Sequence, residues 1–193
     1  MKENLVIISN PLVVEHIVLN EQNYRDFTTE QRLSGGDWRP LDPKKTSSWY
    51  KSMSGGQAST LEGLQQHSSA HVYEFAGGTG FNILCSIGDK KPVRYIGAVG
   101  GDIVDGKIVP NRGAQTFLES INKTECINGV VILPGDQAEC LSISSKDHPD
   151  RILGMNPGVA LQLTGDHVSP IADNTVVYMV RCTPLSRPVI GAF

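Results

Sequence analysis

Residues 76–82 read Ala-Gly-Gly-Thr-Gly-Phe-Asn, and this stretch decides the fold that the sequence predicts. The segment before it, 72–75, alternates as a β-strand does, and the segment 81–87 after it has the apolar spacing of a helix. Adjacent glycines allow positive φ angles and let the backbone approach a neighbour or a ligand closely. We therefore predict a strand, a tight glycine turn and a helix, which is the building unit of an α/β sheet.

This glycine turn has three interpretations. In the first, the glycines serve only the geometry of the turn. In the second, they bring the backbone close to a polyol, and the amide of Asn82, one helical turn further on, faces a hydroxyl group of that ligand. A dinucleotide-binding turn is the third interpretation, but Gly78-x-Gly80-x-x-Ile83 lacks the third glycine of that fingerprint. A Walker A phosphate loop is excluded because no Gly-Lys-Ser/Thr follows.

The rest of the chain contains further strand-like segments. Short apolar runs rich in β-branched residues occur at 5–8, 13–19, 93–99, 130–133, 140–143 and 175–180. Helical spacing at 81–87 and 114–121 separates some of them, which predicts an α/β fold with a mostly parallel sheet flanked by helices. We expect segments 13–19, 72–75 and 140–143 to form a small β lid. Segments 5–8 and 175–180 read as buried strands.

The stretch from Tyr24 to Thr60 is polar and rich in Gly, Ser and Pro. It is expected to be mainly loop, with a short helix near 26–32 and a solvated Lys44-Lys45 pair. Thr60 is a candidate N-cap for a second short helix up to His67. Gly100-Gly101-Asp102 is expected to form a loop after the strand at 93–99.

Composition excludes several classes of function. The 193 residues carry a net charge of −3 with no basic stripe, so no nucleic-acid partner is expected. No apolar run approaches the ~20 residues that a membrane helix needs. The four cysteines are scattered without a Cys-x-x-Cys motif, which favours thiols and a cytoplasmic protein. His67 and His71 have the i, i+4 spacing of metal ligands but lie in a serine-rich stretch, so no metal site is expected.

Several segments together resemble one known family. Gly77-Gly78-x-x-x-Asn82 followed by residues 94–102, Arg-Tyr-Ile-Gly-Ala-Val-Gly-Gly-Asp, is similar to the first signature region of PfkB (ribokinase-type) carbohydrate and nucleoside kinases. Segments 129–133, 151–160 and 178–185 resemble later parts of the same family in the same order. Asn10-Pro11-Leu12 and the long stretch before the glycine pair lean towards the adenosine kinase branch.

This resemblance implies a site and a reaction. In the family the glycine pair and the asparagine contact sugar hydroxyls, which implies substrate binding by Gly77, Gly78 and Asn82. Asn10 and Glu15 are further candidates, Glu15 standing near the place where the family has an aspartate. The family transfers the γ-phosphoryl group of ATP, with Mg²⁺, to a hydroxymethyl group of a sugar or nucleoside such as adenosine or ribose. A substrate glutamate of ribokinase would fall at Cys182, which cannot replace it.

The sequence also lacks the catalytic motif of the family. The catalytic aspartate of the family lies in a Gly-Ala-Gly-Asp loop, and this motif does not occur here. By the resemblance, the magnesium-linked Asn-x-x-Glu segment and the ATP pocket of the family would lie beyond Phe193. We therefore expect residues 1–193 to be the N-terminal, substrate-binding part of a ribokinase-like domain including its lid strands, with the C-terminal half absent. No catalytic residue is assigned, and neither ATP nor Mg²⁺ is expected to bind this chain alone. The expected partners are a sugar or nucleoside and a complementary C-terminal half or dimer partner.

Two other functions stay open at this point. One alternative is a catalytically inactive, kinase-derived binding or regulatory module. The other, which ranks lowest, is a nucleotide-dependent oxidoreductase. The sequence identifies neither the acceptor nor the oligomeric state, and whether these residues alone act as an enzyme is left open.

Overall fold

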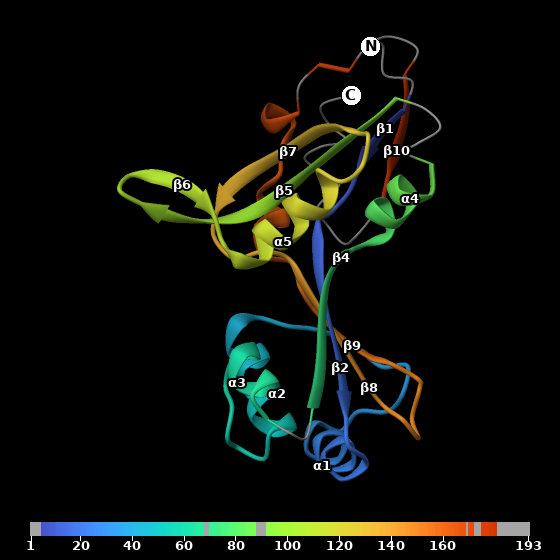
Figure 1. Cartoon of the computed structure of the whole chain (residues 1–193), viewed down its shortest axis with the longest axis vertical. Helices are drawn as coiled ribbons and strands as arrows, with labels where there is room; N and C mark the ends of the chain where they lie inside the picture. Colours follow the sequence, from blue (N-terminus) through green and yellow to red (C-terminus); the bar gives the residue numbers. More distant parts are fainter. Residues whose placement is uncertain (1–4, 68–69, 88–91, 169, 172–174, 181–193) are drawn as a thin grey trace. The chain divides into compact units, whose positions relative to one another are not determined.

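The computed structural model of the chain describes residues 5–67, 70–87, 92–168, 170–171 and 175–180. The chain folds into two compact units, and it passes from one to the other more than once. Unit 1 comprises Met1–Val13, Phe75–Ala138 and Pro157–Phe193, and unit 2 comprises Val14–Glu74 and Glu139–Asn156. Each unit contains most of one five-stranded sheet (Figure 1).

The sheet of unit 1 is mostly parallel, as predicted. Its strands are β1 (Leu5–Ile8), β5 (Val93–Val104), β6 (Lys107–Pro110), β7 (Ile127–Pro134) and β10 (Val176–Met179). The order is β10-β1-β5-β6, with β7 also paired to β5. β1 runs parallel to β10 and β5, and β5 runs parallel to β7, whereas β6 is antiparallel.

Both faces of this sheet are covered, which explains the continuous apolar run in β1. One face packs against α4 (Thr79–Ile87) and α5 (Arg112–Ile121), with Ile7 and Tyr95 in the core. The other face packs against the 3-10 helix η2 (Gly158–Gln162) and the segment after it, which includes η3 (Gly165–His167). Burial of an aliphatic side chain such as Ile7 stabilises the fold by about 1.5–3 kcal/mol.

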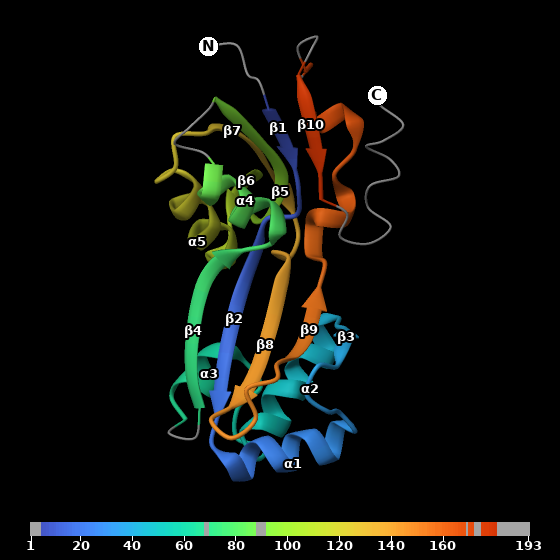
Figure 2. The same ribbon diagram turned by 90° about the vertical axis from the view of Figure 1, so that its right-hand side faces the viewer.

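The sheet of unit 2 has the strand order β3-β9-β8-β2-β4. Figure 2 shows β4, β2, β8 and β9 side by side in this order. They are β2 (Leu12–Leu19), β3 (Trp38–Pro40), β4 (Ala70–Gly77), β8 (Glu139–Ser145) and β9 (Ile152–Asn156). The predicted strands 13–19, 72–75 and 140–143 do share one sheet. Three helices cover one face of it: α1 (Glu21–Gln31), α2 (Pro43–Met53) and α3 (Leu61–Gln65).

The short helix expected near 26–32 is present as part of the longer α1, but the expectation of mainly loop over the rest of 24–60 is wrong. Helices α1 and α2 fill most of that stretch, and α2 carries the Lys44-Lys45 pair. Asn20 and Asp42 cap the two helices, each side chain accepting a hydrogen bond from a first-turn backbone N–H. The short helix after Thr60 is confirmed, with Thr60 as its N-cap.

The predicted loop at Gly100-Gly101-Asp102 is also wrong. β5 continues through these residues to Val104 and turns back into β6 as a hairpin that extends from the sheet (Figure 1). The turn uses positive φ angles at Asp105 and Gly106, of 50° and 73°. Cross-strand partners Ile103 and Ile108 are both exposed on this hairpin.

The last strand differs from its prediction in burial. β10 was expected to be buried, but Val176 is 64% and Tyr178 47% exposed. The physical reason is its place at the edge of the sheet, where β1 is its partner among the described residues. Residues 181–193, including Cys182, lie outside the described part of the chain.

The turn between β1 and β2 is packed against two glycines of unit 1. A Cβ atom on Gly97 would lie 2.6 Å from Pro11 Cδ and 2.6 Å from the Ser9 carbonyl oxygen. A Cβ atom on Gly80, in the first turn of α4, would collide with the Ser9 side chain and lie 3.1 Å from Ile7 Cγ2. Glycine at both positions therefore allows the turn at residues 9–11 to lie against β5 and α4.

Gly80→Ala is expected to destabilise unit 1 although alanine favours helices. Helix propensity favours the change by about 1 kcal/mol, but overpacking costs about 1–3 kcal/mol. The collision falls on atoms next to the backbone of Ser9, which places the overpacking cost in the upper part of its range, so we expect a net loss of up to about 2 kcal/mol. Urea unfolding followed by circular dichroism measures it.

Ser9→Gly provides the matched control, because it removes the side chain with which the new methyl group collides. The double variant should recover most of the stability lost in Gly80→Ala. Additive losses in the two single variants would contradict the close approach as the cause.

Candidate functional site: the glycine turn and the β1–β2 turn

The predicted glycine turn joins β4 to α4. Gly77 is the buried last residue of β4, and Gly78 has a φ of 96°, which an L-residue with a side chain rarely adopts. A Cβ atom on Gly78 would lie 3.0 Å from the Asn10 carbonyl oxygen. The structure thus brings Gly77, Gly78 and Asn10 together in unit 1.

Asn82 lies in the first helical turn of α4. Its backbone N–H donates to the Gly78 carbonyl oxygen at 3.0 Å, which closes the turn into the helix. Asn82 is exposed, whereas its neighbours Phe81 and Leu84 enter the core. The helix therefore fixes the backbone of Asn82 and leaves its amide, a donor and an acceptor, open to a ligand.

Gln137 holds the β1–β2 turn in place, a role that sequence reasoning missed. Its Nε2 donates to the Pro11 carbonyl oxygen at 2.6 Å, and its Oε1 accepts from the Gly100 backbone N–H at 3.0 Å. The side chain is almost fully buried. A buried amide with both ends bonded to backbone fixes the turn relative to β5. In the sequence, Gln137 follows a Pro-Gly-Asp turn and carries no other signal.

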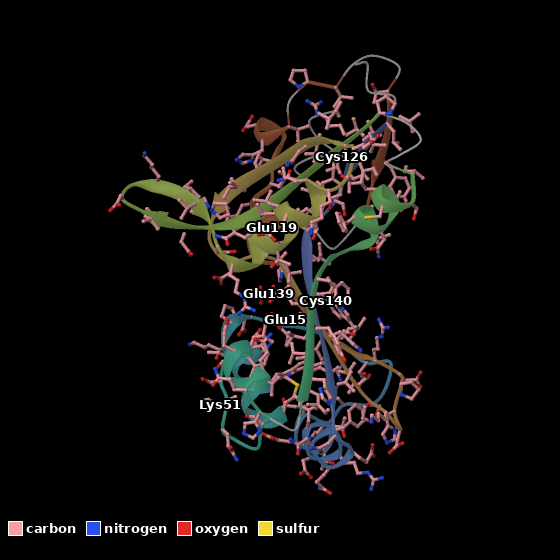
Figure 3. The ribbon with its side chains drawn as sticks, viewed as in Figure 1. Glu15, Lys51, Glu119, Cys126, Glu139 and Cys140 are labelled. Atoms are coloured by element: carbon pink, nitrogen blue, oxygen red, sulfur yellow. The ribbon has the colours of Figure 1, made fainter. Side chains whose placement is uncertain are left out.

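Glu15 lies in unit 2, and its carboxylate has a partner there. Glu15 is 4% exposed, and the Tyr50 hydroxyl donates to its Oε2 at 2.5 Å. Figure 3 labels Glu15 and Glu139, which come from the neighbouring strands β2 and β8. Burial, and after it the nearby Glu15 charge, raise the pKa of Tyr50 far above its ordinary value. The role of Glu15 as a substrate ligand stays a prediction.

The two histidines with metal-ligand spacing, His67 and His71, lie after α3 and on β4. His67 Nε2 lies 2.6 Å from Gln57 Oε1, and His71 is exposed on β4. Within the described ranges, no group of three or more His, Cys, Asp or Glu residues is placed to hold a metal ion. No helix in this part of the chain is long and apolar enough to span a membrane.

Comparison with known proteins identifies the fold. No protein-family model matches the sequence, and no curated protein matches it significantly. Solved structures match it well. An adenosine kinase from Schistosoma mansoni in complex with 2-fluoroadenosine has a TM-score of 0.65 at 16% identity, over 93% of this chain and 47% of that one. An adenosine kinase from Sinorhizobium meliloti has a TM-score of 0.63 at 15% identity, over 88% and 43%.

A probable sugar kinase from Rhizobium etli is also similar, with a TM-score of 0.58 at 15% identity over 87% of this chain and 43% of that one. The chain has the ribokinase-like α/β fold of these adenosine and sugar kinases. It spans less than half the length of the solved structures that it matches. At this identity the likeness concerns the fold.

Tyr50→Phe tests the buried pair in unit 2. The variant leaves the Glu15 carboxylate without this donor, so we expect a loss of about 1–3 kcal/mol at neutral pH. In the unfolded chain Tyr50 ionises as the pH rises past 10.0, whereas the folded chain keeps it protonated. The folded state then binds more protons, so the free energy of unfolding of the parent falls above that pH. Urea unfolding at several pH values measures both effects.

Tyr73→Phe is the control, because Tyr73 is 57% exposed. It should change stability by less than about 0.5 kcal/mol and keep the alkaline slope of the parent. An equal slope above pH 10.0 in the parent and in Tyr50→Phe would contradict the burial of the protonated hydroxyl.

Proposed function

We propose that this chain is the acceptor-binding part of a PfkB-type kinase, which transfers the γ-phosphoryl group of ATP to a hydroxymethyl group of a nucleoside or sugar. The observation that carries the proposal is the side-chain-free turn at Gly77-Gly78, which has the Asn10 backbone beside it and the exposed Asn82 one helical turn further on. Such a turn lets sugar hydroxyls approach backbone groups closely. The fold shared with adenosine and sugar kinases supports the same conclusion.

An adenosine-like acceptor is the first choice. Asn10 and Pro11 lie in the β1–β2 turn and Leu12 begins β2. This Asn10-Pro11-Leu12 stretch is one of the features that resemble the adenosine kinase branch. Two solved structures named above are adenosine kinases, one of them holding 2-fluoroadenosine. In this proposal Gly77, Gly78, Asn10 and Asn82 hold the sugar, and Gln137 positions the turn. Glu15, whose Oε2 accepts from the Tyr50 hydroxyl, stays a prediction and is not used in this proposal.

The proposal assigns no catalytic residue to this chain. The Gly-Ala-Gly-Asp motif that supplies the family's base does not occur in the sequence. When ATP and Mg²⁺ are bound in the whole enzyme, they supply the phosphoryl group and neutralise its charge. These residues would orient the acceptor and keep its hydroxymethyl group in place. A cytoplasmic location belongs to the same proposal, since Cys126 carries a thiol.

Thermal unfolding with added ligands tests the proposal. Adenosine or ribose at a large excess over its dissociation constant should raise the melting temperature by a few degrees, because a ligand stabilises the state that binds it. ATP and NAD should not. Phosphorylation of adenosine by this chain alone would contradict the proposal, as would a shift with NAD and none with adenosine.

Asn82→Ala should weaken adenosine binding about threefold to tenfold, the value of one hydrogen bond. Its melting temperature without ligand should stay near that of the parent, because Asn82 is exposed. Ser86→Ala is the matched control: it lies one turn further along α4, and its hydroxyl donates to the Asn82 carbonyl oxygen at 2.8 Å. Equal affinity in all three proteins would remove Asn82 from the site.

A further inference from the structure

Unit 2 contains a cavity of about 360 Å³ on the helix-covered side of its sheet. The end of α1, the edge strand β3 and the first turns of α2 surround it. Leu33, Leu41 and Trp49 supply apolar surface, and Arg39, Lys45 and Ser48 supply polar atoms. This volume lies at the lower end of the range of about 300–1,000 Å³ that is typical of small-molecule sites.

The apolar floor of this cavity is firmly held. Leu33, Leu41 and Trp49 are each less than a tenth exposed. The Trp49 ring meets Phe27 edge-on, with ring centroids 5.3 Å apart. The ring also lies against Gly154, where an added Cβ atom would be 2.7 Å from Trp49 Cζ3. A ligand would therefore meet a preformed surface and would not have to order it.

Two cations face the same cavity from different elements. Arg39 comes from β3, and its Nη2 lies 3.7 Å from Asp37 Oδ2. That pair is solvent-exposed and long, so it contributes little. Arg39 Nη1 also donates to the Trp38 carbonyl oxygen at 3.0 Å, and the other N–H groups of the guanidinium can take an anion. Lys45 comes from the first turn of α2, and its ammonium group forms no ion pair with the described residues.

We propose that this cavity binds a small organic anion, a carboxylate or phosphate joined to an apolar group about the size of a phenyl ring. Arg39 and Lys45 would hold the anionic end, since a guanidinium offers paired donors to either oxyanion and an ammonium adds a point charge. Trp49, Leu41 and Leu33 would bury the apolar end. The site lies within unit 2, and none of its residues belongs to the proposed acceptor site.

Phenylacetate is the first probe, because it combines one carboxylate with one phenyl ring. The sequence has two tryptophans, Trp38 and Trp49, so the indole N–H signals in ¹H–¹⁵N spectra of the ¹⁵N-labelled full chain report directly on the cavity. Substitution of Trp38 by Phe assigns the two signals. Phenylacetate should shift the Trp49 signal saturably, with half-saturation on the order of 1 mM, as expected for a ligand of this size.

Two matched probes separate the parts of the proposal. 2-Phenylethanol has the same ring without the charge, and acetate has the charge without the ring. Each should bind at least about fivefold more weakly than phenylacetate. Phenyl phosphate distinguishes a carboxylate site from a phosphate site, and saturable binding of either anion supports the proposal. Equal binding of 2-phenylethanol and phenylacetate would overturn it, as would the absence of saturable binding by both anions.

Charge-removing variants complete the test. Lys45→Gln and Arg39→Gln should each raise the half-saturating concentration about threefold to fivefold. Lys44→Gln removes the same charge from the neighbouring residue of α2, which does not line the cavity, and should change it less than about twofold. These residues are exposed, so the variants should fold, which an unchanged spectrum away from the cavity verifies. An equal effect of all three variants would overturn the assignment of the anionic end.

Discussion

The close packing of the turn at Ser9–Pro11 is the constraint on which unit 1 depends. The turn fits because positions 80 and 97 carry no side chain, and Gln137 fixes it by bonding the Pro11 carbonyl and the Gly100 amide. Its position sets where β1 ends, where β2 begins and how α4 leaves the glycine turn. The candidate site is a result of this packing, because the same contact places Asn10 beside Gly78.

The sequence predicted those elements of the fold that depend on a few neighbouring residues. The apolar run of β1, the glycine turn and the capped helix after Thr60 all follow from a few adjacent residues. Helix α2 carried a signal too, which the serines around it obscured. Asp42-Pro43 is a typical helix start, and Thr46, Trp49, Tyr50 and Met53 repeat at i, i+3, i+4 and i+7.

Other features depend on contacts that no local pattern contains. Alternation along β2 puts Glu15 on the same side as the buried Ile17 and Leu19, where a carboxylate would normally be excluded. It is tolerated because Tyr50 donates to it, and Tyr50 is 35 positions further along the chain. Gln137 is similar, since its partner Pro11 is 126 positions away. The same holds for Arg39 and Lys45, which meet at one cavity only after α2 packs on the sheet.

The register of β1 has a consequence for synthesis of the protein on the ribosome. Leu5 pairs with Val93 on one side and with Val176 on the other, so the second edge of β1 finds its partner only when β10 has been made. At about 5–20 residues per second this delay is on the order of ten seconds or more. During that interval an apolar strand has an open edge that another chain can pair with. Slower translation therefore lengthens the time during which the first strand is open to pairing with another chain.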